Sequence, residues 1–244
     1  MQLFWPLFKR EFLGYFRSPV AYVFIVIFLL SSVGTTFFLG GFYDANQAAL
    51  TAFFAYHPWL YLVLVPAVGM RLWAEERKSG TIELLFTLPV TLTEAVLAKF
   101  FAGWAFLGIA LALTFPMVIT VNYLGAPDNG VILAGYLGSF MMAGSYLAVT
   151  CLTSALTKNQ VISFILGVII CFVMVLLGWG IFTNVMANFL PSVAIDVISS
   201  LGFMTHFQSI SRGLIDSRDI IYFASVILVA LSLNTIVLET RKAH

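Results

Sequence analysis

The sequence predicts an all-α integral membrane protein with six transmembrane helices. Hydrophobic residues fill 61% of the 244 positions, charged residues only 9%, and the mean hydropathy is +1.02. That composition is typical of chains that reside in a bilayer. Charged side chains are costly in hydrocarbon, so charge-free stretches mark the spans. Each of the six such stretches has at least 19 residues, enough to cross a core of ~30 Å; they are 18–43, 45–70, 100–127, 129–157, 159–195 and 220–238.

The distribution of Lys and Arg predicts the orientation. With the N-terminus in the cytoplasm, ten of the twelve basic residues lie inside, and only Arg212 and Arg218 lie outside. The positive-inside rule therefore predicts that both termini are cytoplasmic. We expect one transmembrane domain over 1–244, with the first span an uncleaved anchor. The expected spans are about 20–40, 52–73, 97–123, 131–156, 161–182 and 220–238.

A helix in the membrane interface is expected before the first span, over residues 6–17. Its aromatic residues share one face and its arginines share another, which suits the headgroup boundary. The alternative is a cytoplasmic overhang of the first span. Ser18 and Pro19 then provide an N-cap and a first helical residue for that span. The face residues are Phe8, Phe12, Tyr15 and Phe16 on one side, and Arg10 and Arg17 on the other.

A charged island separates the second and third spans. Six of the chain's charged residues fall between Arg71 and Glu83, in an otherwise apolar neighbourhood. Gly80 is expected to end the helix that carries Glu75 to Lys78. A short second helix should follow, with Ile82, Leu85 and Phe86 on one side and Pro89 as its stop. Thr91 and Glu94 then match a capping box that starts the third span.

Prolines, a turn signal and small residues mark features of the remaining spans. Pro66 and Pro116 predict kinks in the second and third spans, and 126–130 is a turn. The fourth span is rich in residues that let helices approach closely, namely Gly135, Gly138, Ser139, Ala143 and Gly144. A short loop at 157–160 makes the fourth and fifth spans a hairpin.

The segment 183–219 differs from the other connections. Its length and moderate polarity predict one or two short helices that dip partway into the outer leaflet, with protein or water covering their ends. Arg212 and Asp216 lie four residues apart near its end. They are either part of an outer gate or a weak surface pair.

Several kinds of chemistry lack their usual sequence patterns. There is no P-loop, no cluster with metal-ligand spacing and no nucleophile–base pair. No ionisable residue falls at the centre of an expected span, which disfavours ion-coupled transport. A membrane enzyme and a self-powered pump are therefore poorly supported. A transporter of this composition needs an ATPase in another chain, and the charged island is the expected docking site.

The run from Glu75 to Pro89, EERKSGTIELLFTLP, resembles the E-E-x-x-x-G-T-x-E-x-L-x-x-x-P motif of ABC-2-type transporter permeases. Its position between the second and third spans is the same, and the other expected features fit along the whole chain. Residues 60–89 and 206–239 are most similar to the gliding-motility-associated branch of that family, which does not imply gliding itself.

The resemblance implies a permease that moves a substrate, by export, across a bacterial inner membrane. It implies two ABC ATPase subunits, which bind ATP and Mg, and a second permease protomer, identical or different. This chain then needs no cofactor of its own and is not an enzyme. Membrane lipid is a further partner, a periplasmic accessory protein an optional one, and nucleic acid is not expected. The implied ATPase-coupling residues are Glu75, Glu76, Gly80, Thr81, Ile82, Glu83, Leu85, Phe86 and Pro89.

Two questions stay open from the sequence. Aromatic residues of the second and fifth spans either line a translocation path or face lipid; they are Tyr56, Trp59, Tyr61, Phe172, Trp179 and Phe182. The function itself has two alternatives. The chain could transmit ATPase strokes mechanically to an envelope partner without passing substrate, or it could be a channel or carrier that needs no ATPase.

Overall fold

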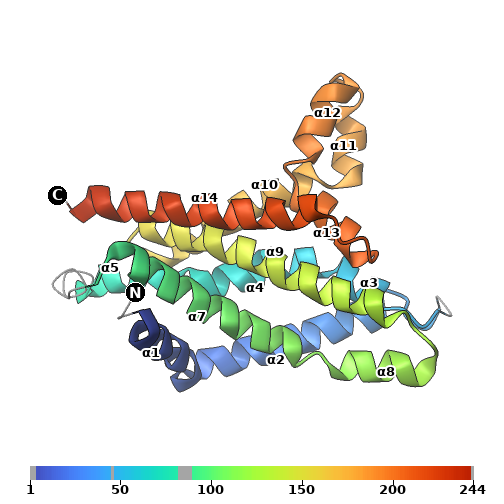
Figure 1. Ribbon diagram of the computed structural model, residues 1–244, viewed down its shortest axis with the longest axis horizontal. Helices are drawn as coiled ribbons and strands as arrows, with labels where there is room; N and C mark the ends of the chain where they lie inside the picture. Colours follow the sequence, from blue (N-terminus) through green and yellow to red (C-terminus); the bar gives the residue numbers. More distant parts are fainter. Residues whose placement is uncertain (1–3, 45–46, 82–89, 243–244) are drawn as a thin grey trace.

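The computed structural model describes residues 4–44, 47–81 and 90–242 (Figure 1). Within these ranges the regular secondary structure is helical and includes no β-strand. The elements are α1 (Phe4–Arg17), α2 (Pro19–Gly34), the π-helix η1 (Thr35–Leu39), α3 (Thr51–Ala55), α4 (His57–Gly69), α5 (Arg71–Ser79), α7 (Leu92–Ala112), α8 (Pro116–Leu124), α9 (Asn129–Leu156), α10 (Gln160–Leu177), α11 (Gly180–Met186), α12 (Ser192–Ser199), α13 (Phe203–Ser211) and α14 (Ser217–Lys242).

Five of these helical segments are long and apolar enough to cross a membrane. They are Pro19–Leu39, Leu92–Leu124, Asn129–Leu156, Gln160–Leu177 and Ser217–Thr240. The sixth expected span, 52–73, is divided among α3, α4 and α5, and α4 has only 13 residues. At 1.5 Å per residue α4 alone is shorter than a hydrocarbon core. The chain is therefore a multi-pass membrane protein, and a sixth span stays a prediction.

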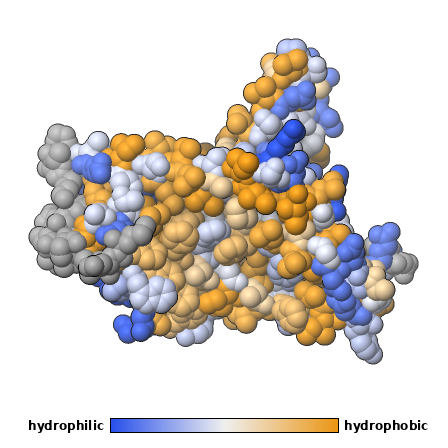
Figure 2. Space-filling view, in the orientation of Figure 1, coloured by the Kyte–Doolittle hydropathy of each residue, from blue (hydrophilic) through white to orange (hydrophobic). Residues whose placement is uncertain are grey.

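The long helices run side by side, and their ends define two ends of the bundle (Figure 1). At one end lie α1, α5, the start of α7 and the C-terminal end of α14; we call it the basic end, because Lys9, Arg10, Arg17, Arg71 and Lys99 lie there. Apolar surface covers the middle of the bundle, and hydrophilic residues gather toward both ends (Figure 2). This distribution is the one that a bilayer around the middle requires.

Side-chain caps start the helices where the sequence predicts them. The Ser18 hydroxyl accepts from the Val20 N–H, with Pro19 at the first helical position. Thr91 and Glu94 form both hydrogen bonds of a capping box at the start of α7. Each cap satisfies N–H groups that have no partner inside the helix. Asp128 and Asn159 cap α9 and α10 in the same way.

The core is organised around α9, which contacts α4, α5, α7, α10, α13 and α14. Its small residues allow this crowding, as expected. A methyl group on Gly135, Gly138 or Gly144 would lie within 3.0 Å of a side chain of a neighbouring helix. Those neighbours are Phe54 of α3, Ile210 of α13 and Trp104 of α7. Close approach of helices at small residues provides van der Waals contact, the main source of helix association in lipid.

The break between α4 and α5 lies at Met70, not at Pro66, where the sequence predicted a kink. A hydroxyl from α9 occupies the break. Ser154 Oγ accepts from the N–H groups of Trp73 and Ala74, both at 3.0 Å, and donates to the Met70 carbonyl at 2.8 Å. A polar group inserted into the helical hydrogen-bond ladder is a recognised cause of such a break. The other predicted kink is confirmed, since α7 ends at Ala112 and α8 begins at Pro116.

The segment before α14 has two parts with different surroundings. Helix α13 packs against α9, α10 and α14 and buries Phe203, Phe207 and Ile210. Helices α11 and α12 bury no residue and project from the side of the bundle as a hairpin (Figure 1). The two ends of this hairpin meet at Gly178 and Gly202. A methyl group on Gly202 would overlap the backbone of Gly178, and one on Gly178 would lie 2.8 Å from Thr205. The sequence predicted one or two short helices here; the structure has three, and only α13 is covered by the rest of the described chain.

Ser154→Ala tests the hydroxyl at the break. The substitution removes the acceptor for two N–H groups and the donor for one buried carbonyl, so we expect a loss of about 1–3 kcal/mol in the free energy of unfolding. For a chain of this length that corresponds to an apparent Tm lower by roughly 2–12 °C. Thermal unfolding in detergent at a fixed scan rate measures it.

Ser32→Ala is the matched control. Ser32 is also buried, but its hydroxyl bonds only to the Leu29 carbonyl of its own helix. We expect its apparent Tm to stay within about 2 °C of the parent value. Equal Tm values for the two variants would show that the hydroxyl at Met70 does not stabilise the break.

Candidate functional site

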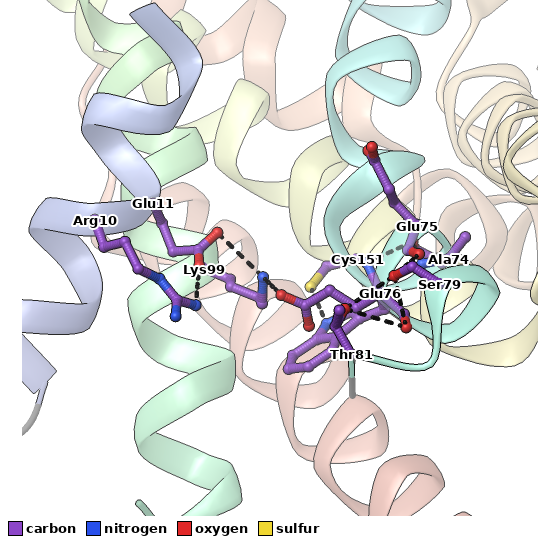
Figure 3. Close-up of polar contacts among 11 residues, drawn as sticks. Arg10, Glu11, Ala74, Glu75, Glu76, Ser79, Thr81, Lys99 and Cys151 are labelled. Carbon is purple, nitrogen blue, oxygen red and sulfur yellow. Dashed lines mark hydrogen bonds and ion pairs between the residues drawn. The ribbon is translucent and has the colours of Figure 1, made fainter. Parts of the chain in front are cut away.

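Three helices bring charged side chains together at the basic end of the bundle. Arg10 and Glu11 come from α1, Glu76 from α5 and Lys99 from the first half of α7. We call these four residues the charge cluster; Figure 3 shows them in one line, with cations and carboxylates alternating. The cluster lies where α5 leaves the bundle toward the segment that carries the ABC-2-like motif.

Lys99 is the centre of the charge cluster. Its side chain is only 5% exposed, and Nζ lies 2.7 Å from Glu76 Oε1 and 3.1 Å from Glu11 Oε2. Nζ also lies 5.3 Å from the centre of the Trp73 ring, which adds a cation–π contact. An ammonium that is out of water needs such partners, since desolvation of an isolated charge costs several kcal/mol. Lys99 therefore binds α1, α5 and α7 to one another.

The polar contacts continue from Trp73 into the bundle. Trp73 is fully buried, and its indole N–H donates to Cys151 Sγ of α9 at 3.3 Å. The Asn234 amide of α14 donates to the same sulfur at 3.0 Å. Sulfur is a weak acceptor, and both donors are fully buried with it. These contacts connect α5, α9 and α14 directly behind the charge cluster.

Glu11 shows how the cluster holds its charges. Burial raises the pKa of the Glu11 carboxyl, but the Lys99 ammonium and the Arg10 guanidinium outweigh burial and hold that pKa below its ordinary value of 4.5. Arg10 lies 2.7 Å from the carboxylate. Glu76 is less completely satisfied, because its Oε2 is buried and accepts no hydrogen bond from any residue the structure describes.

The outer face of α5 is exposed, and the helix ends at Gly80 as predicted. Arg71 pairs with Glu75 at 3.0 Å on the surface, with roughly half of the Glu75 side chain exposed. Gly80 closes the helix in the left-handed conformation, with φ of 75°. Thr81 shares a hydrogen bond of 2.9 Å with Ser79. The predicted coupling residues Ile82, Glu83, Leu85, Phe86 and Pro89 lie outside the described residues.

Sequence reasoning did not single out Glu11 or Lys99. Lys99 was counted only as a basic residue on the inner side of the membrane. Helical spacing contained the signal, because Lys99 falls four residues after Ala95 and four before Gly103, both buried on the same face of α7. A lysine at a core position of an apolar helix indicates a buried partner.

The six aromatic residues considered for a translocation path are not in one place. Trp59 and Trp179 meet edge to face, with ring centroids 5.3 Å apart. Phe172 is exposed on α10. Tyr61 is buried within the chain, where its hydroxyl bonds to Ser139 at 2.7 Å. The partly exposed Tyr56, at the end of α3, and Phe182, in α11, complete the set.

The two residues considered for an outer gate have different neighbours in the structure. Arg212 follows the last residue of α13, and Gly213 then turns the chain with a φ of 87°. Asp216 instead accepts from the Arg218 N–H at 3.0 Å at the start of α14. That hydrogen bond holds the pKa of the Asp216 carboxyl below its ordinary value. Among the described residues, no ion pair joins Arg212 to Asp216.

Comparison with known proteins agrees with the motif. Residues 7–178 match a family described as ABC-2 family transporter protein. Two relatives, both described as "Probable multidrug ABC transporter permease YbhS", come from Escherichia coli strain K12 and from Escherichia coli O157:H7. Each is 32% identical over 122 residues, which cover 48% of this chain. The match spans about a third, 32%, of each relative's length.

Lys99→Met tests the centre of the charge cluster. It leaves the Glu11 and Glu76 carboxylates without their shared cation, and breaking a buried ion pair in this way costs about 3–5 kcal/mol. We expect an apparent Tm lower by roughly 10 °C in detergent. Adding Glu11→Gln and Glu76→Gln to this variant should restore much of the loss.

Arg71→Gln is the matched control, because it breaks the surface pair with Glu75 on the same face of the molecule. Exposed pairs contribute less than about 1 kcal/mol, so its Tm should change little. If both single variants were equally stable, the cluster would not hold the three helices together.

The lowered pKa of Glu11 predicts a pH dependence. The contribution of the ionised carboxylate is fully present above pH 4.5, its ordinary pKa, and is lost as the pH falls through its lower folded value. At pH 7 the parent protein should exceed Glu11→Gln in stability by about 1–3 kcal/mol. Thermal unfolding of both proteins from pH 7 to pH 3 measures the difference, which should shrink below pH 4.5. A constant difference would contradict the assignment.

Proposed function

The chain belongs to the ABC-2 family of transporter proteins, and on that premise we propose that it is the permease subunit of an ATP-binding-cassette transporter. It moves a substrate outward across a bacterial inner membrane. The energy comes from ATP, which is hydrolysed with Mg on a separate ATPase subunit. The whole chain, 1–244, then acts as one transmembrane domain. Both termini and the basic end face the cytoplasm, as the distribution of Lys and Arg favours.

One observation carries the proposal: buried Lys99 joins α5 to α1 and α7. Helix α5 carries the first part of the motif and is directly followed in the chain by the coupling segment, residues 81–88. A displacement of that segment therefore acts on α5. The charge cluster and Ser154 hold α5 to three other helices through contacts that are costly to break inside a membrane. A push on the segment therefore moves several helices together rather than bending one alone.

In this proposal residues 81–88 form a coupling helix that binds a cleft on the ATPase. Ile82, Leu85 and Phe86 fill the cleft, and Glu83 pairs with a basic or amide group there. Two flanking features support the assignment. Gly80 ends α5 in a left-handed turn, and Thr91 caps α7, so the segment is delimited on both sides. Glu75 and Glu76 then transmit its movement to α4 and to the charge cluster.

The proposed complex contains two permease protomers and two ATPase subunits. Trp59 and Trp179, which are already in contact, contribute to an apolar path together with Tyr56, Phe172 and Phe182. Tyr61 supports that path from within the core through Ser139. Arg212 and Asp216 lie at its outer opening on the loop after α13. An apolar path suits a hydrophobic, peptide or lipid-linked substrate, and an accessory protein outside the membrane would accept it.

Affinity purification from native membranes in mild detergent, with mass spectrometry, tests the partnership. We expect an ATP-binding-cassette subunit to co-purify at about one copy per copy of this chain, and any additional protein would indicate the substrate. Repeated purification of the folded chain by itself would overturn the proposal in favour of a channel or carrier.

Glu83→Lys tests the coupling segment. Reversing this charge should abolish ATPase co-purification and transport while leaving insertion and thermal stability unchanged. Glu239→Lys is the matched control, since Glu239 is exposed at the C-terminal end of α14, at the same end of the bundle. It should retain the partner. Full retention of the ATPase by Glu83→Lys would remove Glu83 from the interface.

A further inference from the structure

A groove of about 790 Å³ opens at the basic end, between α1, α2, α4 and α5. Tyr15 of α1 and Lys99 and Phe106 of α7 also line it. Helix α2 packs on α7 and α4 through Phe24 and Phe28, and no contact described so far accounts for this space. We call it the lateral groove. What it binds is decided by its dimensions, its polarity and its charge.

The lateral groove is apolar on one side and charged on the other. Its apolar wall consists of Val20, Val23 and Ile27 on α2, facing Leu64 and Val68 on α4. The three α2 side chains are 54%, 56% and 45% exposed. Its charged part lies toward the basic end, on α1 and α5. A molecule that fills both parts must itself have an apolar body and a polar head.

The length of the apolar wall fits within one leaflet of a bilayer. From Pro19 to Ile27, α2 rises over eight residues, or about 12 Å. The hydrocarbon core is ~30 Å thick, so this is somewhat less than half of it. Ser18 N-caps α2 at the charged end, which is the depth of the headgroups. An acyl chain lying along α2 therefore has the right length and direction.

The charged side chains that line the groove include one more cation than anions. Its lining contains four basic and three acidic side chains, namely Arg10, Arg17, Arg71, Lys99, Glu11, Glu75 and Glu76. The recorded ion pairs join Arg10 to Glu11, Arg71 to Glu75, and Lys99 to Glu11 and Glu76. Arg17 makes no ion pair with any residue of the described ranges. The excess of one positive charge equals the charge of one phosphodiester, and guanidinium groups bind phosphate through paired N–H donors.

We propose that the lateral groove is a binding site for an anionic glycerophospholipid of the adjacent leaflet. The phosphate binds Arg17, and one acyl chain lies between α2 and α4. A free phosphate ion would leave the apolar wall exposed, whereas a lipid covers both parts at once. Since Glu76 and Lys99 also line the groove, the lipid contacts the charge cluster. This inference rests on membrane embedding and does not depend on the ATPase.

Photo-crosslinking tests the site in the purified full-length protein, in nanodiscs that contain phosphatidylglycerol with a diazirine on its acyl chain. Peptide mapping should show labelling concentrated on residues 20–27 and 64–68. Unlabelled phosphatidylglycerol should compete, and inorganic phosphate should not. Labelling spread evenly over the lipid-facing surface, including Ile221 and Leu228 of α14, would overturn the proposal. So would groove labelling that phosphate abolishes.

Two pairs of variants sharpen the test. Arg17→Gln should lower groove labelling about tenfold, the effect of losing one charge-assisted contact. Lys9→Gln, an exposed position of α1 outside the groove, should leave it unchanged. Gly14 lines the groove, and a methyl group added at this position would meet no atom within 4 Å. Gly14→Leu should therefore exclude the lipid without disturbing the fold.

Gly34→Leu is the control for Gly14→Leu. Gly34 also has open space around it but lies in α2 away from the groove. Equal labelling in the two leucine variants, or in Arg17→Gln and Lys9→Gln, would exclude a specific lipid site. Absence of lipid labelling on residues 20–27 in the parent protein would likewise show that the lipid assignment is wrong.

Discussion

Satisfaction of polar groups away from water is the constraint on which this structure depends. Helix α9 satisfies many of these polar groups, because its hydroxyls form hydrogen bonds with the backbone of neighbouring helices. Ser154 replaces the missing ladder bonds at Met70, and Thr153 donates to the Ser163 carbonyl of α10 at 3.1 Å. A helix interrupted inside hydrocarbon is tolerated only where protein completes its hydrogen bonds. The break between α4 and α5 therefore exists because α9 is beside it.

The charge cluster extends the same principle from backbone to ionised groups. Its four members balance in charge, and Lys99 is surrounded by carboxylates from two other helices. Such a cluster adds less stability than an apolar core of equal volume, but it strongly penalises arrangements in which the helices separate. All four members of the cluster also line the lateral groove. Contacts with the bilayer and contacts with the motif segment thus meet at the same side chains.

Local sequence patterns predicted the parts of the fold that local chemistry determines. The caps at Ser18 and Thr91, the break before Pro116 and the left-handed end at Gly80 each follow from neighbouring residues. The break at Met70 was misplaced at Pro66 because its cause, Ser154, lies more than 80 positions further along the chain. Only packing brings the two together.

Candidate-site residues divide in the same way. The motif from Glu75 to Pro89 was identified from its resemblance to ABC-2 permeases, and the described part of it, up to Thr81, ends its helix at Gly80 as expected. Glu11 and Lys99 were missed because each looks like an ordinary charge near a membrane surface until its partners are known. Tyr61 differs from the other path candidates, since packing buries it within the chain, which its sequence position did not indicate.

The order of residues in the charge cluster has a consequence for biogenesis. Lys99 is paired with two carboxylates, those of Glu11 and Glu76. Both of these residues precede Lys99 in the chain. During synthesis they have therefore left the ribosome before the helix that carries the lysine enters the membrane. The ammonium can be neutralised as it arrives, so α7 need not pass through lipid with a bare charge. An assembly in the reverse order would have exposed two buried carboxylates while their cation was still unmade.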